Sequence, residues 1–553
     1  MTAKGPITTA TVRLLSPIGV AAQASRADIA QRTGGSGPYR LGFLDSTRPG
    51  SDLMLARLEE LLAERVGVGT AVRRRKKQSA TVAPFLDDFA GCDGVVAGIA
   101  EIGGSLFGTA MDALELERRG IPVALLVSAE VADACRLLLA RHGMPGIPLV
   151  ELEPTAEAGR DTVLRVAESG VDGVMHVLTA RREDLAGDAE AAVGRAAARE
   201  LAECGPDSIE IPDRVAEVAR ANDLLYRHGW TDGLPVLPPT EAAVAEMLAH
   251  TDLDPGESLG VLAPRQGVAT VAKVAVNAVL AGCPPKLFPL VVAATRAVSD
   301  PDFRLGSVQT TTNPASPLVI VNGPLATALD VNAGRNAFGQ GHRANATLGR
   351  ALRLVLVNIG GARPGIEDRA VQGTPGKYSF CVAENEARSP WEPLHVERGF
   401  PAGTSTVTVV GTESQHNIND HVHTDAEGIL RTVADAMSTI ATNNIYKHNG
   451  EVVVALAPYH AATIAADGWR KRDVRRFLFE HARRPIRDLR RGGQWGLSSW
   501  APWLATDDET ATVPVVGDPA DFLIVVVGGE GKHSSWIPTF GMTRAVTVPV
   551  QPA

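Results

Sequence analysis

Several features are scarce in this sequence, and each absence narrows what the protein can be. The 553 residues include only five cysteines, Cys92, Cys135, Cys204, Cys283 and Cys381, and no two of them form a CxxC pair. This spacing gives no disulfide framework and favours free thiols in a reducing compartment, so we expect a cytoplasmic protein. No apolar run reaches the roughly 18 residues of a membrane span, and residues 1–30 lack the apolar core of a signal peptide.

Charge and motifs exclude further classes. The net charge is −9 and the only dense basic run is Arg73 to Lys77, which argues against nucleic acid as the main partner. That run reads as a solvated strand end or loop, or as a contact for an anion or a partner. The sequence contains no G-x-G-x-x-G and no kinase motif set, so no nucleotide cofactor is expected.

The length and the alternation of apolar segments predict two α/β domains after an N-terminal arm. We expect an arm over residues 1–38, a flavodoxin-like parallel-sheet domain over 39–205, and a larger, loop-rich α/β domain over 206–553. In the first domain, unbroken apolar runs predict buried strands, and helical spacing predicts helices between them. The expected strands are 41–44, 94–99 and 121–127, and the expected helices are 52–64, 106–119 and 131–142, with more helix over 155–205.

The second domain alternates in the same way but with longer loops, which usually line a site. Helices are expected at 268–280, 344–357, 425–441 and 471–482, and strands at 317–322, 406–410, 451–456 and 522–527.

The segment from Leu41 to Glu153 resembles the UGSC-type (seleno)protein family. The resemblance is carried by Leu44-Asp45-Ser46-Thr47, the Arg/Lys run, Cys92-Asp93-Gly94-Val95-Val96-Ala97-Gly98-Ile99, and the block from Asp112 to Pro122. The family is named for a loop of selenocysteine or cysteine, glycine, serine and cysteine, and the aligned loop here reads Ile102-Gly103-Gly104-Ser105. Isoleucine cannot ionise or form a disulfide, so we expect this loop to have lost redox chemistry. Its glycines and the following helix start either bind an anion or form a plain packing turn.

Cys283 lies in Ala281-Gly282-Cys283-Pro284-Pro285-Lys286, between two helical segments. A helix N-terminus and Lys286 would favour the thiolate, so Cys283 is a candidate nucleophile within reach of a cleft. The alternative is a small buried residue, the commonest fate of a free cysteine. The Gly-Cys motif resembles one in C-terminal regions fused to UGSC-like domains, which extends the resemblance through residues 226–540.

Histidines are the most suggestive feature of the second domain. His416, His421 and His423 follow an H-x4-H-x-H spacing that would suit a divalent metal if the segment is extended, whereas hydrogen-bonding or acid–base roles are the alternatives. His460 and His533 each follow a predicted buried strand, and Lys532 precedes His533 in a glycine-rich turn. If these strands and 406–410 run parallel, the histidines meet at one sheet edge.

Amide and guanidinium groups on loops are the candidate substrate-binding residues, with loop tethering as the alternative. They are Asn313, Asn322, Arg343 and Asn345, together with Lys532.

Three functions follow. The first is a small-molecule enzyme with lyase- or hydrolase-like acid–base chemistry, with or without a divalent metal, using His421, His460 and His533. The second is a thiol-dependent oxidoreductase using Cys283, and the third is a non-catalytic binding or scaffold protein. A small polar or anionic substrate and a homodimer or higher homo-oligomer are expected.

Overall fold

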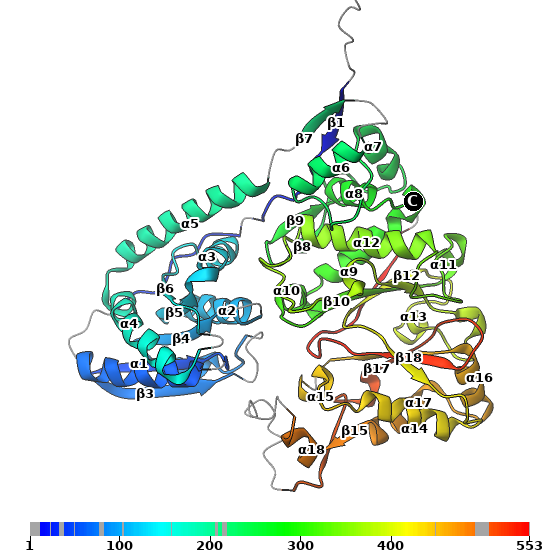
Figure 1. Cartoon of the computed structure of the whole chain (residues 1–553). Helices are drawn as coiled ribbons and strands as arrows, with labels where there is room; N and C mark the ends of the chain where they lie inside the picture. Colours follow the sequence, from blue (N-terminus) through cyan, green and yellow to red (C-terminus); the bar gives the residue numbers. More distant parts are fainter. Residues whose placement is uncertain are drawn as a thin grey trace, which may run out of the picture.

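The computed structural model describes residues 11–22, 24–32, 38–48, 50–76, 82–101, 104–155, 158–204, 208–212, 218–447, 450–492 and 508–551. It forms two units, shown side by side in Figure 1. The N-terminal unit contains five parallel strands in the order β3-β2-β4-β5-β6. Their bounds are β2 (Tyr39–Asp45), β3 (Val68–Arg75), β4 (Gly94–Ala100), β5 (Val123–Ser128) and β6 (Leu149–Leu152).

This order is the doubly wound, flavodoxin-like arrangement, so the prediction for the first domain is confirmed. Every residue of β4 and β5 is buried, because helices cover both faces of the sheet. The helices are α1 (Ser51–Val66), α2 (Gly104–Arg118), α3 (Ala132–Arg141), α4 (Arg160–Thr179) and α5 (Arg182–Cys204). Gly120 follows α2 with a φ of 78°, a left-handed conformation that glycine adopts without strain.

The C-terminal unit contains two four-stranded sheets. The first has the order β11-β10-β12-β19, and β12 runs antiparallel to both of its neighbours. Its strands are β10 (Ser316–Asn322), β11 (Cys381–Ala383), β12 (Thr406–Thr412) and β19 (Val546–Pro549). Its outer face packs on α8 (Val271–Leu280), α9 (Phe288–Ser299) and α12 (Arg343–Asn358), which share one hydrophobic core with it.

The second sheet has the order β13-β18-β14-β17. Its strands are β13 (His416–Asn419), β14 (Val452–Leu456), β17 (Phe522–Val526) and β18 (His533–Ile537). The outer face packs on α14 (Ala426–Met437), α16 (Pro458–Ala466) and α17 (Lys471–His481). Leu318 and Val410 of the first sheet share a core with Val453 and Val525 of the second, so the sheets pack face to face between two helical layers. Figure 1 shows this order, from α12 to α14.

One expectation about the second domain is wrong. Strands β14 and β17 are parallel, as expected, but β12 belongs to the other sheet. The three strands therefore share no common edge.

The two ends of the N-terminal unit are held together on the C-terminal unit. Strand β1 (Thr11–Leu15) pairs antiparallel with β7 (Ser208–Pro212), and Leu14 is fully buried in the core around α8. The chain then continues along the C-terminal unit, where Val20 O accepts a hydrogen bond from Val268 N, before Ala27 N reaches Gly143 O of the N-terminal unit. Within the described ranges, no helix is long and apolar enough to cross a bilayer.

Candidate functional site

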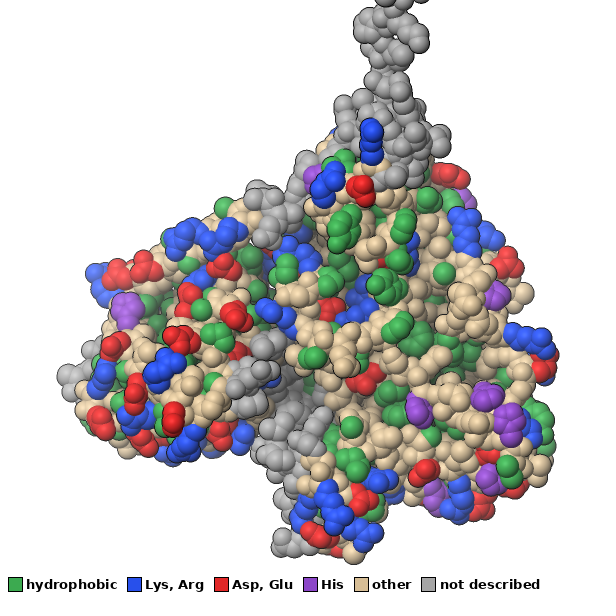
Figure 2. All heavy atoms as spheres, viewed as in Figure 1, with side chains coloured by type: hydrophobic (Ala, Val, Ile, Leu, Met, Phe, Trp, Pro, Cys, Tyr) green, Lys and Arg blue, Asp and Glu red, His purple; other side chains and the backbone are tan. Residues whose placement is uncertain are grey.

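His421 and His533 lie against each other on the surface of the second sheet. Strand β13 pairs with β18 in a register that sets Asn419 opposite His533, and the chain turns back immediately after β13. The turn brings the Nε2 atoms of His421 and His533 to 3.2 Å, and both residues are exposed. Figure 2 shows several histidine side chains on this part of the visible face.

Neighbouring groups orient the two rings. The Nδ1 atom of His533 lies 3.2 Å from Asn417 Oδ1, and Lys532 Nζ donates to the carbonyl of His421 at 3.2 Å. Because an amide oxygen only accepts, His533 Nδ1 donates, and its Nε2 accepts from His421 when both rings are neutral. Lys532 also lies 4.5 Å from the ring centroid of Tyr459.

Asp420 organises the turn between β13 and these rings. Its Oδ1 accepts from the N–H groups of Val422 and His423, and its Oδ2 accepts from His423 Nδ1 and Thr432 Oγ1, both at 2.8 Å. Burial would raise the pKa of Asp420, but these hydrogen bonds hold it well below its ordinary value. Asp420 is thus a carboxylate that fixes the tautomer of His423 and leaves His423 Nε2 as the available base.

His460 lies beneath the turn. It is fully buried in the first turn of α16, with Nε2 3.0 Å from Asp420 O and Nδ1 2.8 Å from Ser534 Oγ. Burial lowers its pKa, so the ring stays neutral and joins α16 to β18 and to the turn. We call His421, His423, His460 and His533, with Asp420 and Lys532, the histidine cluster.

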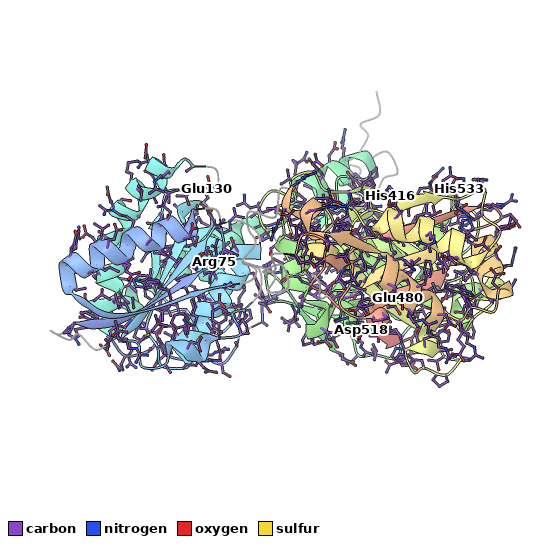
Figure 3. All side chains as sticks on the ribbon, turned by 90° about the horizontal axis from the view of Figure 1, so that it is seen from below. Arg75, Glu130, His416, Glu480, Asp518 and His533 are labelled. Atoms are coloured by element: carbon purple, nitrogen blue, oxygen red, sulfur yellow. The ribbon has the colours of Figure 1, made fainter. Side chains whose placement is uncertain are left out.

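His416 does not join the cluster. It pairs with Trp536, three ladder positions from His533, and the pleat places it on the opposite face of β13 from Asn417 and Asn419. Figure 3 labels His416 and His533 on the C-terminal unit, far from Arg75 and Glu130. The predicted set His416, His421 and His423 assumed an extended segment, but Asp420 bends it. Across the described ranges, no three His, Cys, Asp or Glu side chains are grouped to hold a metal ion.

The expected accessibility of Cys283 is wrong. Cys283 follows α8, is 4% exposed, and belongs to the core that α8, α9 and α12 share. Burial raises the pKa of its thiol to about 12, against the smaller opposing effects of Thr347 and Arg343. Lys286 instead lies 3.8 Å from Asp330. The thiol therefore stays protonated and shielded at neutral pH.

The predicted amide and guanidinium residues mostly hold loops. Asn345 is buried and bonds both backbone groups of Asn332, and Asn322 donates to Glu384 and Glu386 at 2.7 and 2.9 Å. Asn313 bonds Thr311 and Asn443, and Arg343 donates to Gly282 O. Of the proposed substrate-binding residues, only Lys532 lies in the histidine cluster.

The N-terminal unit has polar residues at its own switch point, between the paired strands β2 and β4, from which the chain connects to opposite sides of the sheet. Asp45 ends β2, accepts from Ser51 Oγ at 2.7 Å and pairs with Arg75 at 3.1 Å. Ile102 and Gly103 lie outside the described residues. Gly104 and Ser105 open α2 directly after the central strand β4, which is where the loop was predicted.

Sequence reasoning missed Asp420 and Asn417. An aspartate two and three residues before its backbone donors is a signal for an Asx turn, and it argues against an extended His421-to-His423 segment. Asn417 has no such local signal, because its contact with His533 depends on the pairing of β13 with β18.

Residues 13–180 match the model of the UGSC family. The match runs from β1 to the end of α4 and covers less than a third of the 553 residues. It supports UGSC-type membership for the N-terminal unit, whereas the replaced redox loop and a family-associated C-terminal domain stay predictions. No curated protein and no solved structure matches the chain.

Proposed function

We propose that the chain is an enzyme of small-molecule metabolism, and that its C-terminal unit performs lyase- or hydrolase-like acid–base chemistry at the histidine cluster. The observation that carries the proposal is the 3.2 Å separation of the Nε2 atoms of His421 and His533, two exposed imidazoles. Imidazole is the side chain whose ordinary pKa lies closest to neutral pH, so such a pair can give and take protons there.

The surroundings of the pair suit a small polar or anionic substrate. Lys532 adds a positive charge beside His421, and the His423 ring offers a second base oriented by Asp420. A carboxylate that holds one ring nitrogen of a histidine keeps the other nitrogen available for proton transfer. His460 and Ser534 hold this arrangement from below rather than touching a substrate.

The same pair is compatible with metal assistance. A Zn²⁺ ion bound to two imidazoles at roughly 2.0–2.1 Å from each nitrogen needs a spacing close to that of His421 and His533. Asn417 would orient His533 as a carbonyl or carboxylate orients a metal-ligating histidine. The remaining ligands would come from water or substrate.

The test measures proton exchange and hydrolysis by NMR in D2O on a panel of hydroxy acids, keto acids, esters and lactones. We expect turnover of at least one compound, with His421→Ala and His533→Ala each losing roughly 100-fold or more. His250→Ala is the control, because His250 is half-buried on another part of the unit, where its Nδ1 lies 3.1 Å from Glu246 O.

Elemental analysis of the purified protein decides the metal question separately. A stoichiometric metal lost in His533→Ala would support metal assistance. Equal turnover in the wild type and both cluster variants would refute the proposal and favour the binding or scaffold alternative. The cytoplasmic location and the homo-oligomeric state stay predictions.

A further inference from the structure

A cavity of 980 Å³ opens in the C-terminal unit, away from the histidine cluster. Its walls are the end of α6 (Val218–Arg227), the turn over 229–233, the middle of α12 and the loop over 362–378. Small-molecule sites usually enclose roughly 300–1,000 Å³. The cavity is thus large enough for an organic ligand.

Lys377 is a primary amine on the wall of this cavity. Its side chain is 18% exposed, and its Nζ donates to both carboxylate oxygens of Asp368 at 2.5 and 2.6 Å. Nζ has no other hydrogen-bond partner in the described parts of the chain. A neutral amine has two N–H groups and one lone pair. Because Asp368 accepts both N–H groups, the lone pair of a neutral Lys377 is left for an electrophile in the cavity.

The charges around Lys377 favour the neutral amine. Asp232 already accepts from Arg350 at 2.7 and 2.8 Å. Asp368 is therefore the carboxylate that Lys377 and the buried Arg353 share. Three cations thus face two acids, and only Lys377 can lose its proton, because a guanidinium stays charged. Loss of that proton removes the excess positive charge from this wall.

The desolvation of Lys377 acts in the same direction. Burial lowers the pKa of Lys377; Asp368 opposes this effect, and Arg353 adds to it. A desolvated lysine next to another cationic group is activated as a nucleophile at neutral pH. Two aromatic side chains, Tyr226 and Tyr378, also line the cavity and are 66% and 51% exposed. They offer surface to the apolar part of a ligand.

We propose that Lys377 forms an imine with an aldehyde or ketone bound in this cavity, whose apolar or aromatic body lies against Tyr226 and Tyr378. The Nζ lone pair attacks the carbonyl carbon, and the carbonyl π electrons move to the oxygen. Asp368 takes a proton from the nitrogen and passes it to the alkoxide, and a second proton follows the same route to the leaving hydroxyl. Water departs as the C=N bond forms, so amine and carbonyl compound give imine and water without another reactant.

Reductive trapping on the full chain tests the proposal, with benzaldehyde as the probe and cyanoborohydride as the trapping reagent. Peptide mass mapping should show Lys377 modified about tenfold faster than Lys286 at pH 7, the ratio that one pKa unit produces. Lys286 is the matched control, because its side chain is 50% exposed, lies 3.8 Å from Asp330 and is not part of the cavity wall. Benzyl alcohol, which has the ring but no carbonyl group, should slow the modification of Lys377 alone.

Arg353→Met distinguishes an effect of the surrounding charge from simple exposure of Lys377. The variant leaves Asp368 to Lys377 alone, so the ammonium form is favoured and trapping at Lys377 should fall about tenfold, the change that one pKa unit produces. Arg296→Gln is the control, since Arg296 pairs with Glu257 at 3.0 Å and lies outside the cavity.

Two results would overturn the proposal. They are trapping at Lys377 no faster than at Lys286, or equal trapping at Lys377 in the wild type and Arg353→Met. The first comparison uses the wild-type chain, so it does not depend on the folding of a variant. The site is separate from the histidine cluster, and His421→Ala should leave trapping at Lys377 unchanged. Failure at the histidine cluster and failure at the cavity are therefore distinguished.

Discussion

Two buried cations, one in each unit, differ in whether a carboxylate is paired with them. Lys76 in the N-terminal unit is 1% exposed and lies 2.6 Å from Asp112, which is itself buried. Arg353 in the C-terminal unit is buried to a similar degree, but its neighbouring carboxylates are held by Arg350 and Lys377. Lys76 is thus neutralised by a buried partner, whereas Arg353 keeps two buried donors, Nε and Nη2, without a hydrogen-bond partner in the described ranges.

Breaking the Lys76 pair should have the largest effect. Asp112→Ala leaves Lys76 without its carboxylate and also removes the acceptor of Ala83 N, so we expect a loss of about 3–5 kcal/mol in unfolding free energy. Arg353→Met should change it by less than about 1 kcal/mol. Urea unfolding followed by circular dichroism measures both variants.

Tryptophan fluorescence supplies the control for this comparison, because all seven tryptophans follow the N-terminal unit in the sequence, the first being Trp230. The loss in Asp112→Ala should appear in circular dichroism while the fluorescence transition stays in place. A loss of similar size for Arg353→Met would contradict the contrast between the two cations.

Asp420 sharpens the comparison, because it is a buried charge balanced by hydrogen bonds from its own turn. Since its folded pKa is depressed, its stabilisation is present above the ordinary aspartate pKa and is lost as the pH falls through the folded value. Asp420→Asn should therefore cost about 1.5–3 kcal/mol at pH 7 and little at the acid end.

Fluorescence-detected unfolding across this pH range measures the effect of Asp420→Asn. Asp435→Asn, an exposed position on α14, is the control. A cost that did not depend on pH would show that the Asp420 charge is not the stabilising feature.

The smallest expected effect concerns Cys283, a buried residue that carries no charge because its thiol stays protonated. With its pKa raised to about 12 and its side chain in the core, iodoacetamide at pH 8 should label it only after unfolding. Peptide mass mapping of native and denatured samples follows the label. Rapid native labelling would restore the nucleophile hypothesis.

Local pattern predicted much of the fold. The unbroken apolar runs of β4 and β5 and the helical spacing between them indicated a parallel sheet covered on both faces, and the structure has it. The partner of β12 was not predictable, because Thr406–Thr412 is buried at every position, and such a strand fits either sheet of a four-layer unit equally well.

The histidine cluster was predicted for a reason that proved wrong. His421 and His533 do meet, but through the antiparallel pairing of β13 with β18 rather than along a shared parallel edge. Arg353 was missed although a signal was present. An arginine between Leu352 and Leu354 in an apolar helix is expected to be buried, and a buried arginine is usually paired with a carboxylate or another hydrogen-bond acceptor.

The ribbon of β1 and β7 makes the N-terminal unit an insertion. The first connection leaves the C-terminal unit after Ala22, which bonds Gln266, and the second returns at β7 beside β1. The segment between them is a closed loop, and loop closure costs only about 0.6 kcal/mol more for each doubling of length. A change in the length of that loop should therefore alter the stability of the C-terminal unit little, as long as the contacts of the chain up to Ala22 are kept. The family match runs from residue 13, inside β1, to residue 180, before β7. The segment that matches the family and the segment inserted between β1 and β7 therefore have different ends.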